Sequence, residues 1–107
     1  MENITFDFKS RTAIVTGGAQ GFGFDITKRL LKSGAKVIIW DNDPKAIQSA
    51  LKDINNPNLS SNVVDVSNYE EVEKTVKKIT KNSNIDILIN NAGITGPTAT
   101  LWEYDIE

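Results

Sequence analysis

Residues 16–23 read Thr-Gly-Gly-Ala-Gln-Gly-Phe-Gly, and this stretch decides the fold. It follows a β-branched run at 12–16 and precedes a segment with helical spacing of apolar residues, so we interpret it as a strand-to-helix turn. Gly17 would allow the sharp turn, Gly21 would let the backbone approach a phosphate, and Gly23 would let the helix pack closely on the sheet. Free N–H groups at the helix start would then face a pyrophosphate. The alternative is an ordinary tight turn with spare glycines.

Three further apolar runs, at 37–40, 63–66 and 85–89, have the length of buried parallel strands. Segments with one apolar helical face separate them. Strands that alternate with helices predict an α/β fold with a parallel sheet, doubly wound in the order 3-2-1-4. In that order the strands at 12–16 and 37–40 lie inside, and those at 63–66 and 85–89 lie at the two edges.

Short polar motifs mark the helix boundaries. Asp43 followed by Pro44 is typical of an N-cap with proline at the first helical position. Ser67 and Glu70 have the spacing of a capping box, which predicts that Ser67 is the N-cap of the third helix. Gly34 is the expected stop of the first helix.

Asp41 ends the second strand and lies 18 residues beyond Gly23. That spacing suits an acid that accepts hydrogen bonds from the hydroxyls of an adenosine ribose. The same carboxylate would repel a 2′-phosphate, and neither Asn42 nor Asp43 supplies a compensating cation. The sequence therefore predicts NAD in preference to NADP. The alternative is that Asp41 caps the following helix, a role for which Asp43 is better placed.

Composition excludes several other classes of function. The chain has 107 residues, no Cys, no His and a formal charge of −2. Disulfides, thiolate or imidazole catalysis and Cys-type zinc sites are excluded, and no metal site is expected. The mild acidity argues against nucleic acid as a partner, and apolar runs of four residues or fewer argue against a membrane span. Because the first five residues lack signal-peptide features, we expect a cytoplasmic location.

The turn at 16–23 resembles the T-G-x-x-x-G-x-G motif of the short-chain dehydrogenase/reductase family. Asp65-Val66, and Asn90-Asn91-Ala92-Gly93, match two further motifs of that family at the right spacing. The resemblance implies that residues 1–107 are a partial NAD-binding Rossmann domain, the N-terminal half of such a protein. The parent reaction would be hydride transfer between a nicotinamide and an alcohol or carbonyl carbon.

The resemblance also assigns roles to single residues. Asp65 and Val66 would contact the adenine, and Asn91 would pass along the nicotinamide ribose, whereas Asn90 would brace the sheet. A turn is the simpler interpretation of the Asn pair taken alone. The expected cofactor-binding residues are Gly17, Gly18, Ala19, Gln20, Gly21, Phe22, Gly23, Asp41, Asp65, Val66, Asn91, Ala92 and Gly93.

Three residues depart from the family pattern, and two of them, Phe24 and Asp25, stand where the family often has a small or basic residue. Phe22 replaces a frequent aliphatic residue and would narrow the cofactor cleft. Asp25 is expected in the first turn of the helix, where its carboxylate would repel a bound diphosphate if it pointed inward.

The family's catalytic Ser and Tyr-x-x-x-Lys are not found in the 107 residues, because Glu73 stands four places after Tyr69 and Tyr104 has no residue four places on. We therefore expect no catalytic residue and an inert chain when it acts alone. The alternatives are a non-catalytic nucleotide-binding module and a truncated remnant without function. The apolar strand at 85–89 would form an open sheet edge, which predicts self-association or pairing with a missing C-terminal half.

Overall fold

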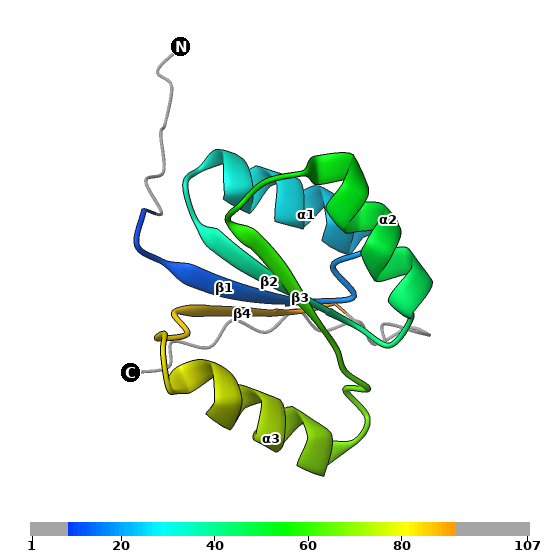
Figure 1. Cartoon of the computed structure of the whole chain (residues 1–107), viewed down its shortest axis with the longest axis vertical. Coiled ribbons are helices and arrows are strands. Elements are labelled where there is room, and N and C mark those ends of the chain that lie inside the picture. Colours follow the sequence, from blue (N-terminus) through cyan, green and yellow to red (C-terminus); the bar gives the residue numbers. More distant parts are fainter. Residues whose placement is uncertain (1–8, 92–107) are drawn as a thin grey trace.

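A parallel β-sheet with helices on both faces forms the described part of the chain, residues 9–91 of the computed structural model (Figure 1). In chain order the elements are β1 (Thr12–Thr16), α1 (Gly21–Lys32), β2 (Lys36–Asp41), α2 (Pro44–Ile54), β3 (Leu59–Val63), α3 (Tyr69–Thr80) and β4 (Ile87–Asn90). The sheet has the order β3-β2-β1-β4. The predicted α/β class and the predicted 3-2-1-4 order are both confirmed.

The register of the parallel sheet places the buried residues of the two inner strands, β1 and β2, next to each other. Val15 pairs with Ile39 of β2 on one side and with Ile89 of β4 on the other, all in parallel. Val15 and Ile39 have no exposed surface, whereas the residues of β4 are all half-buried. Position in the sheet thus explains why β1 is buried throughout while the two edge strands are not.

Two apolar layers cover the two faces of the sheet. Helices α1 and α2 lie together on one face and α3 lies on the other (Figure 1). The layer under α1 and α2 includes Val37, Ile39, Leu31 and Ile47, all of which are buried. The layer facing α3 is smaller, and α3 itself has no fully buried residue. The α3 face is therefore the less tightly covered of the two within residues 9–91.

The strand expected at 63–66 is wrong by several residues. The structure has β3 at Leu59–Val63, a mostly polar edge strand that pairs with β2 alone. Val64 directly follows β3, and its N–H still donates to the Asp41 carbonyl oxygen of β2 at 3.0 Å. Its side chain is 1% exposed and belongs to the apolar layer that faces α3. In the same way Ile85 is buried but precedes β4, which begins at Ile87 rather than at residue 85.

The helix caps agree with the prediction at two of three places. Asp43 accepts hydrogen bonds from the N–H groups of Lys45 and Ala46, at 3.0 and 3.4 Å, and Gly34 takes a φ of 94° after α1. The prediction of Ser67 as the N-cap of α3 is wrong. Asn68 caps this helix and its Oδ1 accepts the Glu71 N–H at 3.1 Å, because the Ser67 hydroxyl is already bonded elsewhere.

Candidate functional site

The glycine-rich turn joins β1 to α1 and leaves no room for a side chain at Gly23. Gly17 and Gly21 have positive φ angles of 65° and 53°, which favour glycine. A Cβ atom built on Gly23 would lie 2.2 Å from the carbonyl oxygen of Gly17. Gly23 therefore allows the first turn of α1 to press against the loop that precedes it. By contrast, a Cβ on Gly21 meets nothing within 4 Å, so the space above that residue is open.

Gly18 and Ala19 face the interior of the protein. A Cβ on Gly18 would lie 2.6 Å from Ile39 Cγ2 and 2.9 Å from the Val15 carbonyl oxygen. Ala19 is 9% exposed and belongs to the apolar layer under α1 and α2. The structure thus gives both residues a packing role, and their contact with a cofactor stays a prediction.

The start of α1 differs from the starts of the other two helices. Asp43 caps α2 and Asn68 caps α3, but no side chain in residues 9–91 caps α1, whose N-cap position is Gln20. The first N–H groups of a helix have no partner within the helix and carry a partial positive charge. At α1 these donors are left for a group from outside the described chain, and an anion suits them best.

A cavity of about 490 Å³ lies at the carboxyl ends of the strands, beside this helix start. Its volume falls within the range of small-molecule sites. Six predicted residues line it, namely Gly17, Gln20, Asp41, Asp65, Val66 and Asn91. Four further lining residues were missed by sequence reasoning, namely Trp40, Asn42, Val64 and Ser67. Trp40 and Val64 stand in apolar runs, which predict a place in the core rather than in a site. Asn42 and Ser67 could have been predicted from their positions close to Asp41 and Asp65.

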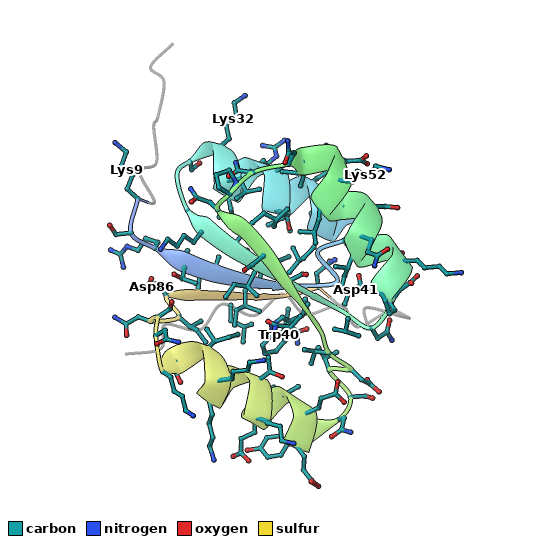
Figure 2. All side chains as sticks on the ribbon, in the orientation of Figure 1. Lys9, Lys32, Trp40, Asp41, Lys52 and Asp86 are labelled. Atoms are coloured by element: carbon teal, nitrogen blue, oxygen red, sulfur yellow. The ribbon has the colours of Figure 1, made fainter. Side chains whose placement is uncertain are left out.

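Asp41 lies where β2 turns into α2 (Figure 2). Its Oδ1 accepts the N–H of Asp43 at 3.1 Å, which fixes the orientation of the carboxylate. Its second oxygen, Oδ2, has no hydrogen-bond partner within residues 9–91. The side chain does not cap α2, since Asp43 does so, and the capping alternative for Asp41 is therefore excluded.

Asp65 is held by its neighbours on the far wall of the cavity. Its Oδ1 accepts hydrogen bonds from the Ser67 hydroxyl at 2.6 Å and from the Ser67 N–H at 3.0 Å. These bonds favour the charged form and lower the pKa of the Asp65 carboxyl. The N–H of Asp65 donates to Glu71 Oε1 at 3.0 Å, so the first turn of α3 also anchors this residue. Asp65 therefore presents a fixed, ionised carboxylate at the rim.

The hydroxyl of Thr16 joins the ends of β1 and β4. It donates to Asn90 Oδ1 at 2.9 Å and accepts the Asn91 N–H at 2.7 Å. The predicted bracing role of Asn90 thus has a geometric basis, although the bond comes from its side chain. The side-chain nitrogen of Asn91 lies 2.7 Å from the Cβ position of Gly23, which places Asn91 against the glycine turn.

The other predicted residues lie elsewhere. The side chain of Phe22 is 64% exposed, and it does not line the cavity. The expected position of Asp25 in the first turn of α1 is wrong, because that helix begins at Gly21 and its first turn holds no acid. Asp25 is exposed and pairs with Lys28 at 3.6 Å, away from the cavity. Ala92 and Gly93 lie outside the described residues.

Residues 9–91 contain neither a cluster of metal-ligating side chains nor a helix that could span a membrane. Three or more His, Cys, Asp or Glu side chains do not come together there in a way that could hold a metal ion. None of the described helices is both long enough and apolar enough to cross a membrane.

Comparison with known proteins gives a consistent picture. The family model for short chain dehydrogenase matches residues 11–107. The chain is 34% identical over 101 residues to a 2-dehydro-3-deoxy-L-rhamnonate dehydrogenase (NAD(+)) from Sphingomonas sp. (strain SKA58), covering 94% of this chain and 40% of that protein. It is 40% identical over 90 residues to a 3-oxoacyl-(acyl-carrier-protein) reductase FabG from Chlamydia muridarum, covering 80% and 36%.

A solved structure agrees with these relatives. The chain superimposes on the RhlG/NADP active-site complex from Pseudomonas aeruginosa with a TM-score of 0.74, at 31% identity, covering 83% of this chain and 37% of that one. The chain thus spans about two fifths of the length of the curated relatives and of this structure. Both NAD and NADP occur in the names of these proteins, so the choice of cofactor has to be argued from the cavity itself.

Proposed function

The chain belongs to the short-chain dehydrogenase family, and from that premise we propose that it binds the adenosine and pyrophosphate portions of a nicotinamide dinucleotide in the cavity beside α1. The observation that carries the proposal is the uncapped start of α1, next to a glycine turn that leaves open space at Gly21. Backbone N–H groups in this position are suited to a phosphate. The alternative of an ordinary tight turn gives no reason for leaving these donors uncapped.

The residues around the cavity fit such a cofactor. Gly17 and Gln20 line the side next to the helix start, where the pyrophosphate would lie. Asp41 would hold the adenosine ribose through Oδ2, and the wall formed by Asp65 and Val66 would hold the base. Asn91 lies against the glycine turn and would face the nicotinamide ribose. The bound nicotinamide would supply hydride chemistry, while these residues bind and orient it.

Asp41 is the reason for proposing NAD rather than NADP. Its carboxylate lines the cavity, and Asn42 beside it carries no charge. A 2′-phosphate at about 4 Å from this carboxylate would be repelled by about 1–4 kcal/mol for each unit of charge, between the dielectric of water and that of a protein surface. We therefore expect NADP to bind at least tenfold more weakly than NAD.

Calorimetric titration of the 107-residue chain with NAD, NADP and AMP tests the proposal. NAD and AMP are expected to bind. Asp41→Ala is expected to weaken NAD binding, because the ribose loses its acceptor, and to strengthen NADP binding, because the repulsion of the 2′-phosphate is removed. Glu73→Ala is the matched control, because it removes the same charge from an exposed position on α3 outside the cavity. Absence of binding at millimolar nucleotide would refute the proposal, and equal binding of NAD and NADP would refute the role of Asp41.

We propose that this chain has no dehydrogenase activity by itself, since a Tyr-x-x-x-Lys sequence does not occur in its 107 residues. The parent activity of the whole enzyme, hydride transfer to or from an alcohol or carbonyl carbon, would need a further segment. Turnover of an alcohol with NAD by the purified chain would contradict this.

The edge of β4 is the place where a further segment would join. Within the described residues β4 is an outermost strand, and Ile87, Leu88 and Ile89 are only half-buried. We propose that this edge pairs either with the remaining part of the family's fold or with a second copy of the chain. Sedimentation of the isolated chain distinguishes these two partners, because only pairing with a second copy produces a dimer when no other polypeptide is present. If the chain sediments as a monomer and does not bind a separately expressed C-terminal half, both proposals are refuted.

A further inference from the structure

The indole of Trp40 carries a buried donor that has no acceptor nearby. Trp40 is 2% exposed and lies between the sheet and α3 (Figure 2). Its Nε1 is the buried side-chain polar atom that has no hydrogen-bond partner within residues 9–91. A buried N–H without an acceptor is unfavourable, because it has given up its bond to water. Such an atom calls for an explanation.

The same residue forms part of the candidate site. Trp40 and Val64 both line the cavity of about 490 Å³ that Asp65 and Val66 also line. The carbonyl oxygen of Trp40 accepts the Gly17 N–H at 2.7 Å, so the glycine turn fixes the backbone of this residue. Trp40 therefore belongs to the cavity wall and to the apolar layer beneath it.

The surroundings of the indole would strengthen a hydrogen bond made there. Ile14 and Val64, each 1% exposed, belong to the same apolar cluster. A hydrogen bond in such a setting is electrostatically stronger than one in water. The cover on the other side is looser, because Val72 and Val76 of α3 are only partly buried. Because Nε1 is buried, a bond from it to a ligand in the cavity requires the indole to turn toward that cavity.

We propose that Trp40 determines specificity for a purine base, with its Nε1–H donating to a ring nitrogen of the bound nucleotide. The inference rests on the proposed nucleotide binding and adds to it the recognition of the base. The phosphates are assigned to the start of α1 and the ribose to Asp41, so the part of the ligand that reaches the wall of Trp40, Val64 and Val66 is the base. A flat heterocycle with acceptor nitrogens matches an indole and two valines in shape and in hydrogen bonding.

The experiment removes the N–H without changing the shape of the side chain. In a Trp102→Phe background Trp40 is the single tryptophan, so biosynthetic replacement by β-(3-benzothienyl)alanine, in which sulfur replaces N–H, affects this position alone. AMP is titrated against the tryptophan and benzothienyl proteins by calorimetry. We expect AMP to bind about 3- to 12-fold more weakly to the benzothienyl protein, which is the loss in affinity expected from one neutral hydrogen bond.

Ligand analogues identify the acceptor. Of 1-deaza-, 3-deaza- and 7-deaza-AMP, one is expected to bind the tryptophan protein more weakly by the same factor and to lose nothing further in the benzothienyl protein. Trp40 emission is expected to shift to longer wavelength when AMP binds, and not when inorganic phosphate is added.

The outcomes separate this inference from the function on which it rests. If the tryptophan protein binds AMP and the benzothienyl protein binds it within twofold, the inference is overturned and the proposed function stands. If the tryptophan protein binds all three deaza analogues as tightly as AMP, the inference is likewise overturned and the proposed function stands. If the tryptophan protein binds neither NAD nor AMP at millimolar concentration, the proposed function fails and the inference fails with it. Circular dichroism checks that both proteins are equally folded, and Trp40→Phe gives a second test if they are not.

Discussion

Gly23→Ala is expected to destabilise the protein although alanine is the better helix former. The new Cβ would lie 2.2 Å from the Gly17 carbonyl oxygen, 2.8 Å from its carbonyl carbon and 2.7 Å from Asn91 Nδ2. The two Gly17 contacts are with backbone, so relief requires the turn to open. Overpacking typically costs about 1–3 kcal/mol and occasionally more, and so close an approach to a backbone oxygen belongs at or above the upper end of that range. Alanine is more favourable than glycine in a helix by about 1 kcal/mol, and this offsets part of the cost. We expect a net loss of about 2 kcal/mol or more in the free energy of unfolding.

Gly21→Ala is the matched control for this prediction, because it makes the same chemical change two residues earlier. Its Cβ meets no atom within 4 Å, and the cost arises only from the φ of 53°. That cost is roughly 1–2 kcal/mol. Urea unfolding followed by circular dichroism measures both, and nucleotide titration should show a larger loss of affinity for Gly23→Ala. If Gly23→Ala unfolds at the same or a higher urea concentration than Gly21→Ala, the close contact between helix and turn is not what requires this glycine.

Three further changes test other parts of the site. Thr16→Val should cost about 1–3 kcal/mol in urea unfolding, because the Asn91 N–H loses its acceptor; Thr16→Ser should restore most of it. Asp43→Ala should cost about 1 kcal/mol through loss of the α2 cap, and an unchanged unfolding midpoint would contradict the capping geometry. Ser67→Ala should raise the pKa of Asp65 in an NMR titration, since both bonds that lower it come from Ser67 and one is to its hydroxyl. Because the folded pKa of Asp65 is lowered, its contribution to stability is present above the pKa of an unfolded aspartate and is lost as the pH falls through the folded value.

The central part of the fold could be predicted from the sequence, and its edges could not. β1 is buried along its whole length and reads as a short run rich in β-branched residues, so its bounds were predicted correctly. β3 is an edge strand with Ser60, Ser61 and Asn62, and such residues carry no strand signal. The stronger signal came from Val64, which follows the last residue of β3 and is buried in the apolar layer that faces α3. Apolar character reports burial, and at an edge burial and strand pairing no longer coincide.

The candidate site was predictable where a residue type is required by the backbone. Gly17 and Gly21 have positive φ angles, and Gly23 has no room for a side chain, so the glycine pattern follows from geometry. Trp40 was not predictable as a site residue, because an aromatic residue in an apolar strand normally belongs to the core. Its unpaired Nε1, in a residue that also lines the cavity, separates it from the other buried residues of that layer.

The pairing of β4 with β1 shows how a short edge strand can position a site residue. Only four residue pairs join these strands, which are more than 70 residues apart in the chain. Side chains reinforce the pairing at both ends. Before β4, Asp86 accepts the Thr12 N–H at 2.8 Å and pairs with Arg11 at 3.7 Å. After β4, the Thr16 hydroxyl accepts the Asn91 N–H. Since each end is held, the strand cannot slip along β1 without breaking a buried or half-buried hydrogen bond, and this is what keeps Asn91 beside the glycine turn.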